Sequence, residues 1–133
     1  MKVVALDYGS ARTGIAVSDP TGTLARPVGV VERVRTPAGL ERLVELIREE
    51  APERVVVGLP LTLRGERGEQ ARETEEFVES LRQRLDVPVD GFDERFTTDL
   101  AEQSTGSRNL PADARAAAHL LTSYLAWSSR GGV

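Results

Sequence analysis

Three acidic residues stand where their carboxylates could act together: Asp7, Glu94 and Asp113. Asp7 ends an apolar run at the beginning of the chain, Glu94 follows another short run, and Asp113 falls in the first turn of the last predicted helix. Carboxylates around one point can hold one or two hard divalent cations through oxygen ligands. Two such ions stabilise both the attacking and the leaving oxygen of a phosphoryl displacement. An in-line phosphoryl displacement is the chemistry that this set allows.

Each acid also has an ordinary structural interpretation. Asp7 could close an Asx turn with the residues behind it. Glu94 could form a surface ion pair with Arg95 or Arg12. Asp113 could be the N-cap of its helix. The expectation that all three meet at one rim is what favours the catalytic interpretation.

Short apolar runs bounded by turn residues predict five strands, over residues 2–6, 14–18, 24–34, 54–60 and 87–92. The first two should form a hairpin. Pro27 and Gly29 in the third indicate an irregular or edge strand. The first and fourth runs are too apolar for a strand with one solvent-exposed face, which is typical of strands buried on both faces. Ligands bind beyond the carboxyl ends of such strands, so Asp7 lies at the expected place.

Helical spacing of apolar residues predicts helices over residues 37–50, 69–85 and 112–128, with a short helix over 97–104. Thr36 is the expected N-cap of the first helix and Pro37 its first residue. On the second helix we expect a solvent-facing charged side that comprises Glu69, Arg72, Glu73, Glu76 and Glu79.

The spacing on the last helix places Asp113 on one face with Ala116, Ala117, Leu120 and Tyr124. Because apolar residues dominate that face, we expect it to be buried. A carboxylate there is costly unless it is paired or binds a cation.

Together these elements predict an α/β fold: a mixed five-stranded sheet of strand order 3-2-1-4-5 with helices on both faces. Consecutive early strands suit an antiparallel meander, and the later strand-helix-strand units suit right-handed parallel crossovers. This is the order of a ribonuclease-H-like (RNase H-like) fold. At 133 residues, we expect a single domain over 1–133.

The composition limits the remaining possibilities. The chain has no cysteine, which excludes disulfides and thiolate metal sites. Its apolar runs are too short to span a membrane, so we expect a cytoplasmic protein. The net charge of −4 argues mildly against a nucleic-acid binder. However, nearly all the basic residues are arginines, which bind phosphate through a forked contact.

Four motifs, in order, resemble the YqgF/RuvX family of Holliday junction resolvases. They are 6–9 (LDYG) with 12–19 (RTGIAVSD), 57–61 (VGLPL) with Gly65, 93–98 (DERFTT), and Asp113 with the alanines, leucine and tyrosine that follow it up to residue 125. The motifs span nearly the whole chain, and together they are highly specific.

The resemblance implies a Mg²⁺- or Mn²⁺-dependent nuclease, a family now mostly linked to maturation of the small-subunit ribosomal RNA precursor. It implies that Asp7, Glu94 and Asp113 are the catalytic, metal-binding acids. The residues expected to bind substrate are Arg12, Arg64, Arg67, Arg95, Thr97 and Arg108. RuvC-type sites also use an acid at the end of strand four, where this chain has Gly58.

Our first interpretation is therefore cleavage of structured RNA, in the 5′-end processing of pre-16S rRNA. Resolution of DNA junctions is one alternative, and a module that binds RNA or the ribosome without cutting is another. An actin-like phosphotransferase needs two lobes, for which this chain is too short. We expect nucleic acid and ribosomal precursor particles as partners, no membrane, and a monomer or weak homodimer.

Overall fold

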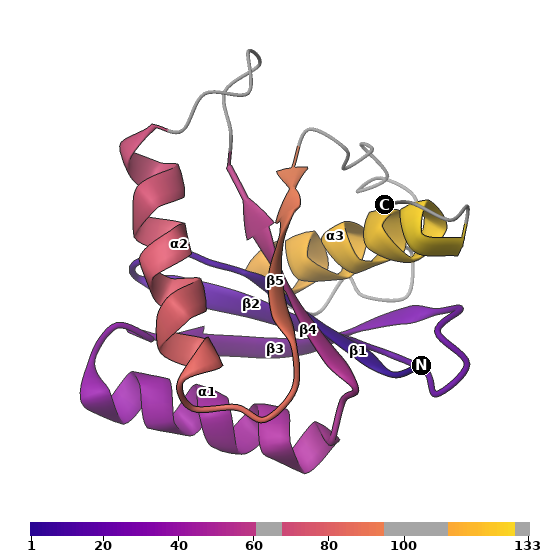
Figure 1. Ribbon diagram of the computed structural model, residues 1–133, viewed down its shortest axis with the longest axis horizontal. Helices are drawn as coiled ribbons and strands as arrows, with labels where there is room; N and C mark the ends of the chain where they lie inside the picture. The colour runs from indigo at the N-terminus through magenta and orange to yellow at the C-terminus, as the bar shows by residue number, and fades with distance from the viewer. Residues whose placement is uncertain (61–67, 95–111, 130–133) are drawn as a thin grey trace.

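The computed structural model describes residues 1–60, 68–94 and 112–129. Figure 1 shows their elements, which in chain order are β1 (Val3–Asp7), β2 (Arg12–Ser18), β3 (Ala25–Glu32), α1 (Pro37–Glu50), β4 (Arg54–Leu59), α2 (Glu69–Arg82), β5 (Val89–Asp93) and α3 (Ala112–Ser129). Among these described helices, none combines the length and the apolar character needed to cross a membrane.

The five strands form one mixed sheet in the order β3-β2-β1-β4-β5. β1 pairs antiparallel with β2, and β2 with β3, whereas β1 and β4 are parallel, as are β4 and β5. The predicted strand order is confirmed. Because β1, β4 and β5 run the same way, their carboxyl ends meet at one edge of the sheet.

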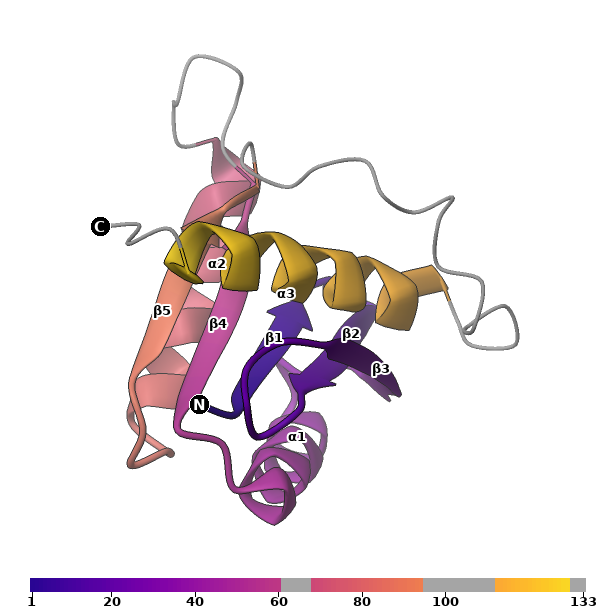
Figure 2. The same ribbon diagram turned by 90° about the vertical axis from the view of Figure 1, so that its right-hand side faces the viewer.

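Helices cover both faces of the sheet: α1 and α2 lie on one side and α3 crosses the other (Figures 1 and 2). Alternate residues of β1 pack into the two cores on either side of the sheet, because successive side chains of a strand point to opposite faces. Val4 and Leu6 belong to the core under α1 and α2. Val3 and Ala5 belong to the core under α3. A strand buried on both faces is what the apolar run predicted.

Several boundaries differ from the expected ones by a few residues. β1 extends to Asp7, so this acid is the last residue of the strand. β3 is shorter than expected, and its pairing with β2 shifts register between Ile15 and Ala16. It is an edge strand, as its proline and glycine indicated. α2 ends at Arg82 and β5 begins at Val89. The helix expected over 97–104 lies outside the described residues.

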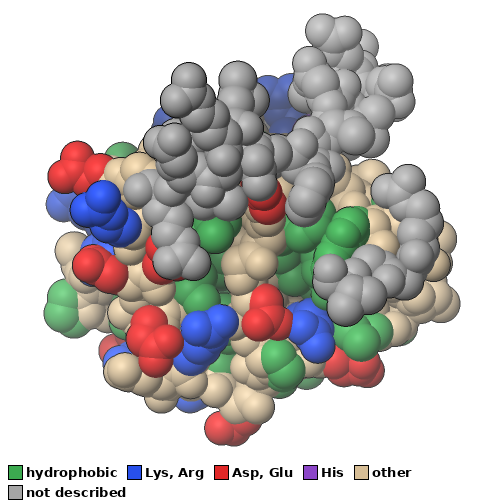
Figure 3. Space-filling model, turned by 45° about the horizontal axis from the view of Figure 1, so that its top comes forward, with side chains coloured by type: hydrophobic (Ala, Val, Ile, Leu, Met, Phe, Trp, Pro, Cys, Tyr) green, Lys and Arg blue, Asp and Glu red, His purple; other side chains and the backbone are tan. Residues whose placement is uncertain are grey.

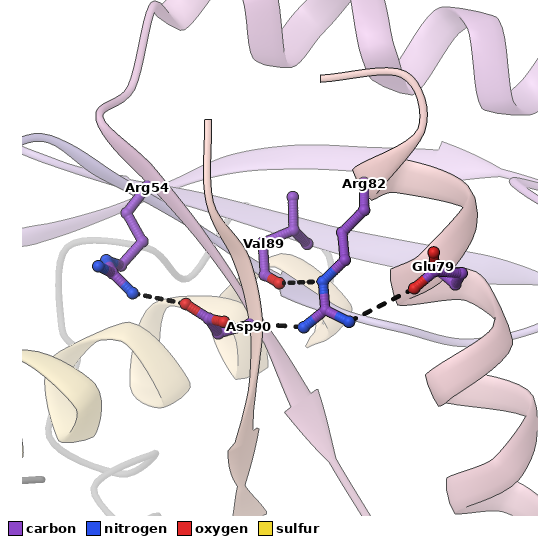
Figure 4. A network of polar contacts seen from close by, with 5 residues as sticks. All are labelled: Arg54, Glu79, Arg82, Val89 and Asp90. Atoms are coloured by element: carbon purple, nitrogen blue, oxygen red, sulfur yellow. Dashed lines mark hydrogen bonds and ion pairs between the residues drawn. The ribbon is translucent and has the colours of Figure 1, made fainter. Parts of the chain in front are cut away.

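A polar network fastens α2 to the other edge strand, β5 (Figure 4). The Nε of Arg82 donates a hydrogen bond to the carbonyl oxygen of Val89 at 2.8 Å. Asp90 forms ion pairs with both Arg82 and Arg54, and Glu79 also pairs with Arg82. The network holds the strand whose carboxyl end carries Glu94.

Candidate active site

Asp7 and Glu94 come together at the carboxyl edge of the sheet. Asp7 ends β1, and Glu94 directly follows β5. β4 lies between these two strands, and its Gly58 is paired with Phe92 of β5. Two acids that are far apart in sequence are therefore neighbours because parallel strands bring their ends to the same place.

The two carboxyl groups share a hydrogen bond that shapes their protonation. Burial raises the pKa of Asp7, and the negative charge of Asp113 adds to the increase. The pKa of Glu94 rises to about 7 through burial, the charge of Asp7 and the hydrogen bond between the two groups. Near neutral pH Glu94 can therefore keep its proton and donate it to Asp7. Adjacent carboxylates that resist ionising together are a frequent property of functional sites.

Gly58 makes room for this pair. A Cβ atom at residue 58 would lie 2.7 Å from Oε1 of Glu94 and 3.1 Å from Cδ2 of Leu120. A side chain at the end of β4 would thus displace the carboxylate of Glu94. Glycine at this position therefore leaves free the space that Glu94 occupies.

α3 brings Asp113 to the same edge through a close contact with β2. Gly14 is the register partner of Asp7. A Cβ atom at Gly14 would lie only 1.8 Å from the carbonyl oxygen of Asp113, so only glycine allows the helix to approach this closely. Asp113 pairs with Arg12 at 3.3 Å between its Oδ2 and the arginine Nε.

The structure corrects the expected surroundings of Asp113. Its side chain is 35% exposed, and Ala116 is exposed as well, so these two do not lie on the buried face. That face consists of Ala114, Ala117, Ala118, Leu120, Leu121, Ser123 and Tyr124. Asp113 is also the second residue of α3, inside the helix and not its N-cap.

The described residues supply two converging acids and a third nearby. Within residues 1–60, 68–94 and 112–129, no three His, Cys, Asp or Glu side chains are grouped closely enough to hold a metal ion. Asp7 and Glu94 nevertheless offer carboxylate oxygens, the ligands that Mg²⁺ and Mn²⁺ prefer. A cation at this pair would compensate the burial that raises both pKa values, and the charge of Asp7 that raises the pKa of Glu94 further, so the donor set suits a hard divalent ion.

A cavity of about 320 Å³ opens beside this pair, toward α2. Its described lining comprises Asp7, Tyr8, Gly9, Ser10, Gly58, Pro60, Gln70, Glu73, Thr74 and Glu94. Five of these residues carry polar side chains that sequence reasoning did not assign to a site: Tyr8, Ser10, Gln70, Glu73 and Thr74. Figure 1 shows the beginning of α2 standing beside the strand ends.

Glu73 departs most from expectation, because it is not on a solvent-facing side. The Tyr8 hydroxyl donates a hydrogen bond to Oε1 of Glu73 at 2.6 Å. The ring of Tyr8 packs on Phe77 with centroids 4.6 Å apart. Burial, followed by this hydrogen bond, raises the pKa of Tyr8 to about 12, so the phenol stays a donor. The available signal was spacing: Glu73 precedes the buried Phe77 by four residues, which places both on one side of α2.

Of the predicted substrate-binding residues, the structure describes Arg12, which is exposed at the start of β2. The others lie outside the described residues: Arg64, Arg67, Arg95, Thr97 and Arg108. On the described surface that Figure 3 shows, acidic and basic side chains alternate and do not separate into patches of one sign.

Comparison with known proteins identifies relatives over nearly the whole chain. Residues 1–127 match the family model described as "RuvX: Holliday junction resolvase". A Rubrobacter xylanophilus protein named "Putative pre-16S rRNA nuclease" is 47% identical over 130 residues, which cover 93% of this chain and 91% of the relative. A Syntrophomonas wolfei protein of the same name is 38% identical over 138 residues, which cover 98% of each chain.

Solved structures with the same architecture confirm the RNase H-like fold. Thermus thermophilus RuvC in complex with a Holliday junction substrate superposes with a TM-score of 0.69, covering 99% of this chain and 97% of that one. The sequence identity is 19%, so this likeness concerns the fold. A fowlpox virus resolvase bound to junction DNA gives a TM-score of 0.52 at 11% identity, over 98% of this chain and 97% of that chain.

Proposed function

This chain belongs to the RuvX family, and from that premise we propose that it is a divalent-metal-dependent nuclease that hydrolyses phosphodiester bonds in structured RNA. The observation that carries the proposal is the pair formed by Asp7 and Glu94, whose side chains are hydrogen-bonded at the carboxyl edge of the sheet. Two partly buried carboxylates held together in this way repel each other when both are ionised, whereas a bound cation would stabilise both and could also bind a phosphate.

In the proposed site Asp7 and Glu94 hold the cation, which is Mg²⁺ or Mn²⁺. When bound, such an ion neutralises charge on the phosphate oxygens and makes hydroxide available near neutral pH. Strand pairing fixes the backbone of Asp7 at the sheet edge, and the space at Gly58 accommodates the carboxylate of Glu94, so the fold places both groups before the substrate enters. Such preorganisation lowers the barrier because the groups are already placed for the transition state.

Asp113 and Arg12 act as a second, more exposed pair. The contact with Gly14 fixes the backbone of Asp113 beside β2, so its carboxylate can orient water or complete the ligand set. Arg12 pairs with Asp113 and is 62% exposed, so its guanidinium can turn to a substrate phosphate. We assign the same phosphate-binding role to the four other predicted arginines, and a substrate contact to Thr97.

For the substrate we propose the precursor of 16S rRNA, the RNA for which the relatives are named. Ribosomal precursor particles are then the partners, the cytoplasm is the site of action, and a monomer suffices because one strand is cut. Resolution of Holliday junctions is the second candidate, favoured by the description of the family. It would require two active sites related by symmetry, and hence a dimer.

A side-by-side cleavage assay tests the proposal. A structured RNA that spans the precursor cleavage region and a four-way DNA junction are each incubated with Mg²⁺, Mn²⁺ or a chelator. We expect metal-dependent cutting of the RNA that Asp7→Asn abolishes and that Asp86→Asn, at an exposed carboxylate before β5, retains. Paired cuts in the junction alone would favour resolution instead. RNA that is bound but never cut, equally by Asp7→Asn and wild type, would refute the nuclease and leave a binding module.

A further inference from the structure

The cavity beside the carboxylate pair has a size and a chemistry that specify its occupant. Its volume of about 320 Å³ lies at the lower end of the range for small-ligand sites. It is too small for a stacked duplex and suits one nucleotide unit. The cavity adjoins Asp7 and Glu94, so the occupant would be attached to the phosphate that these acids act on.

The charge of the described lining disfavours a second phosphate as that occupant. Among its described lining residues, the cavity has three carboxylates and neither lysine nor arginine. The three are Asp7, Glu94 and Glu73. An anion placed deep in this space would be repelled by the charges of Asp7 and Glu73. An uncharged group, such as a sugar or a base, avoids this repulsion.

Two hydroxyl groups of the lining, those of Tyr8 and Thr74, already donate their hydrogens within the protein. Tyr8 uses its hydroxyl hydrogen in the bond to Glu73, and Thr74 donates its own to the carbonyl oxygen of Gln70 at 2.8 Å. Both hydrogens are therefore committed to the protein. A carboxylate has about four acceptor positions, so Glu73 keeps acceptor capacity after it binds Tyr8. A ligand group that donates a hydrogen bond therefore matches Glu73, while Ser10 and Gln70, which also line the cavity, can donate or accept.

We propose that this cavity binds the ribose and base of one unpaired nucleotide next to the scissile phosphate, with Glu73 accepting a hydrogen bond from it. Ribose 2′-hydroxyls and exocyclic amino groups are the donors that such a nucleotide offers. A paired base is stacked in its duplex and cannot enter. The inference rests on the proposed nuclease function and adds to it a means by which RNA is distinguished from DNA and single strands from duplexes.

Binding of short labelled oligonucleotides tests the inference without relying on cleavage. Fluorescence anisotropy compares a single-stranded RNA octamer, the DNA of the same sequence and the RNA in a duplex, with Ca²⁺ in place of Mg²⁺ and a gel to verify that the RNA stays intact. We expect wild type to bind the single-stranded RNA about tenfold more tightly than the DNA, the effect of one hydrogen bond to a charged acceptor.

Glu73→Gln is the decisive variant, because it can still accept the hydrogen bond from Tyr8 while its amide turns one wall of the cavity from acceptor to donor. We expect it to lose most of the preference for RNA, and its melting temperature verifies that it is folded. Glu79→Gln, two turns away on α2 and paired with Arg82, is the matched control and should retain the preference. Single 2′-deoxy positions and inosine in place of guanosine distinguish a ribose donor from a base donor.

The outcomes separate this inference from the function on which it rests. If Glu73→Gln keeps the RNA preference of wild type, or if duplex RNA binds wild type as tightly as single-stranded RNA, the inference is overturned even when the enzyme cuts RNA. If wild type cuts no RNA, but binds RNA more tightly than DNA and Glu73→Gln removes this difference, the cavity assignment stands and the nuclease proposal fails.

Discussion

Replacing Glu94 by glutamine should make the metal-free protein more stable at alkaline pH while it abolishes cleavage. The folded state raises the pKa of Glu94 from 4.5 to about 7. A carboxyl group whose pKa is raised by folding makes its full contribution to stability at pH values below its pKa in the unfolded state. This contribution is lost as the pH rises through its pKa in the folded state. The window therefore runs from about pH 4.5 to about pH 7.

The size of the effect follows from the shift. At 1.36 kcal/mol per pKa unit, the difference between 4.5 and about 7 corresponds to a ceiling of about 3.4 kcal/mol. Glu94 is only partly buried, so solvent screens its interaction with Asp7 and reduces the expected loss to about 1–2 kcal/mol. Glutamine carries no charge at any of these pH values and can donate its amide hydrogen to Asp7.

Urea unfolding in chelator, at pH 4.5 and pH 8, measures the difference in unfolding free energy between wild type and Glu94→Gln. Groups that titrate alike in both proteins cancel in this difference. We expect wild type to lose about 1–2 kcal/mol relative to the variant over this range, and added Mn²⁺ to restore wild type more than the variant. A difference that stays constant with pH, or that changes in favour of wild type, would refute the repulsive pair.

Three further substitutions test how the fold positions the site. Gly14→Ala should cost about 1–3 kcal/mol in urea unfolding and also lower cleavage, because the new Cβ would push the start of α3, and Asp113 with it, away from β2; unchanged cleavage would argue against a role for Asp113. Arg82→Ala should cost about 1 kcal/mol through the lost hydrogen bond to Val89, with little change in cleavage rate. Leu81→Ala, at a fully buried position on the inner face of α2, should cost about 2–5 kcal/mol and leave cleavage by the folded fraction intact, as unfolding curves and specific activity would show together.

The strand framework could be predicted from the sequence because its signals are local. Apolar runs closed by glycine, proline or aspartate mark β1 and β4 wherever they lie in the chain, and the right-handed crossover rule then fixes their neighbours. Asp7 follows from the same reasoning, since a residue that ends a doubly buried strand must reach the sheet edge. The same reasoning places Glu94, which directly follows β5, at that edge. The motifs added the prediction that these acids bind metal and catalyse cleavage.

The sequence also determined that Asp113 begins the last helix, but not how deeply its side chain is buried. Helical spacing gives the relative angles of residues, whereas the rotation of the helix against the sheet decides which of them point inward. The small residues Gly14, Ala114 and Ala117 let α3 approach the sheet closely, and at this rotation Ala116 faces outward and Asp113 lies at the margin. A contact between elements a hundred residues apart sets that rotation.

The cavity is the feature that only the tertiary structure decided. In the sequence Glu73 is one of several glutamates on a charged helix, and Tyr8 is an aromatic residue after a strand. Packing of Tyr8 on Phe77 brings its hydroxyl to Glu73, which lines the same cavity as Asp7 and Glu94. Local patterns determine which elements form and where their ends lie. The direction of a side chain between two elements depends on how those elements pack, because a hydrogen bond or a cavity requires both partners in place.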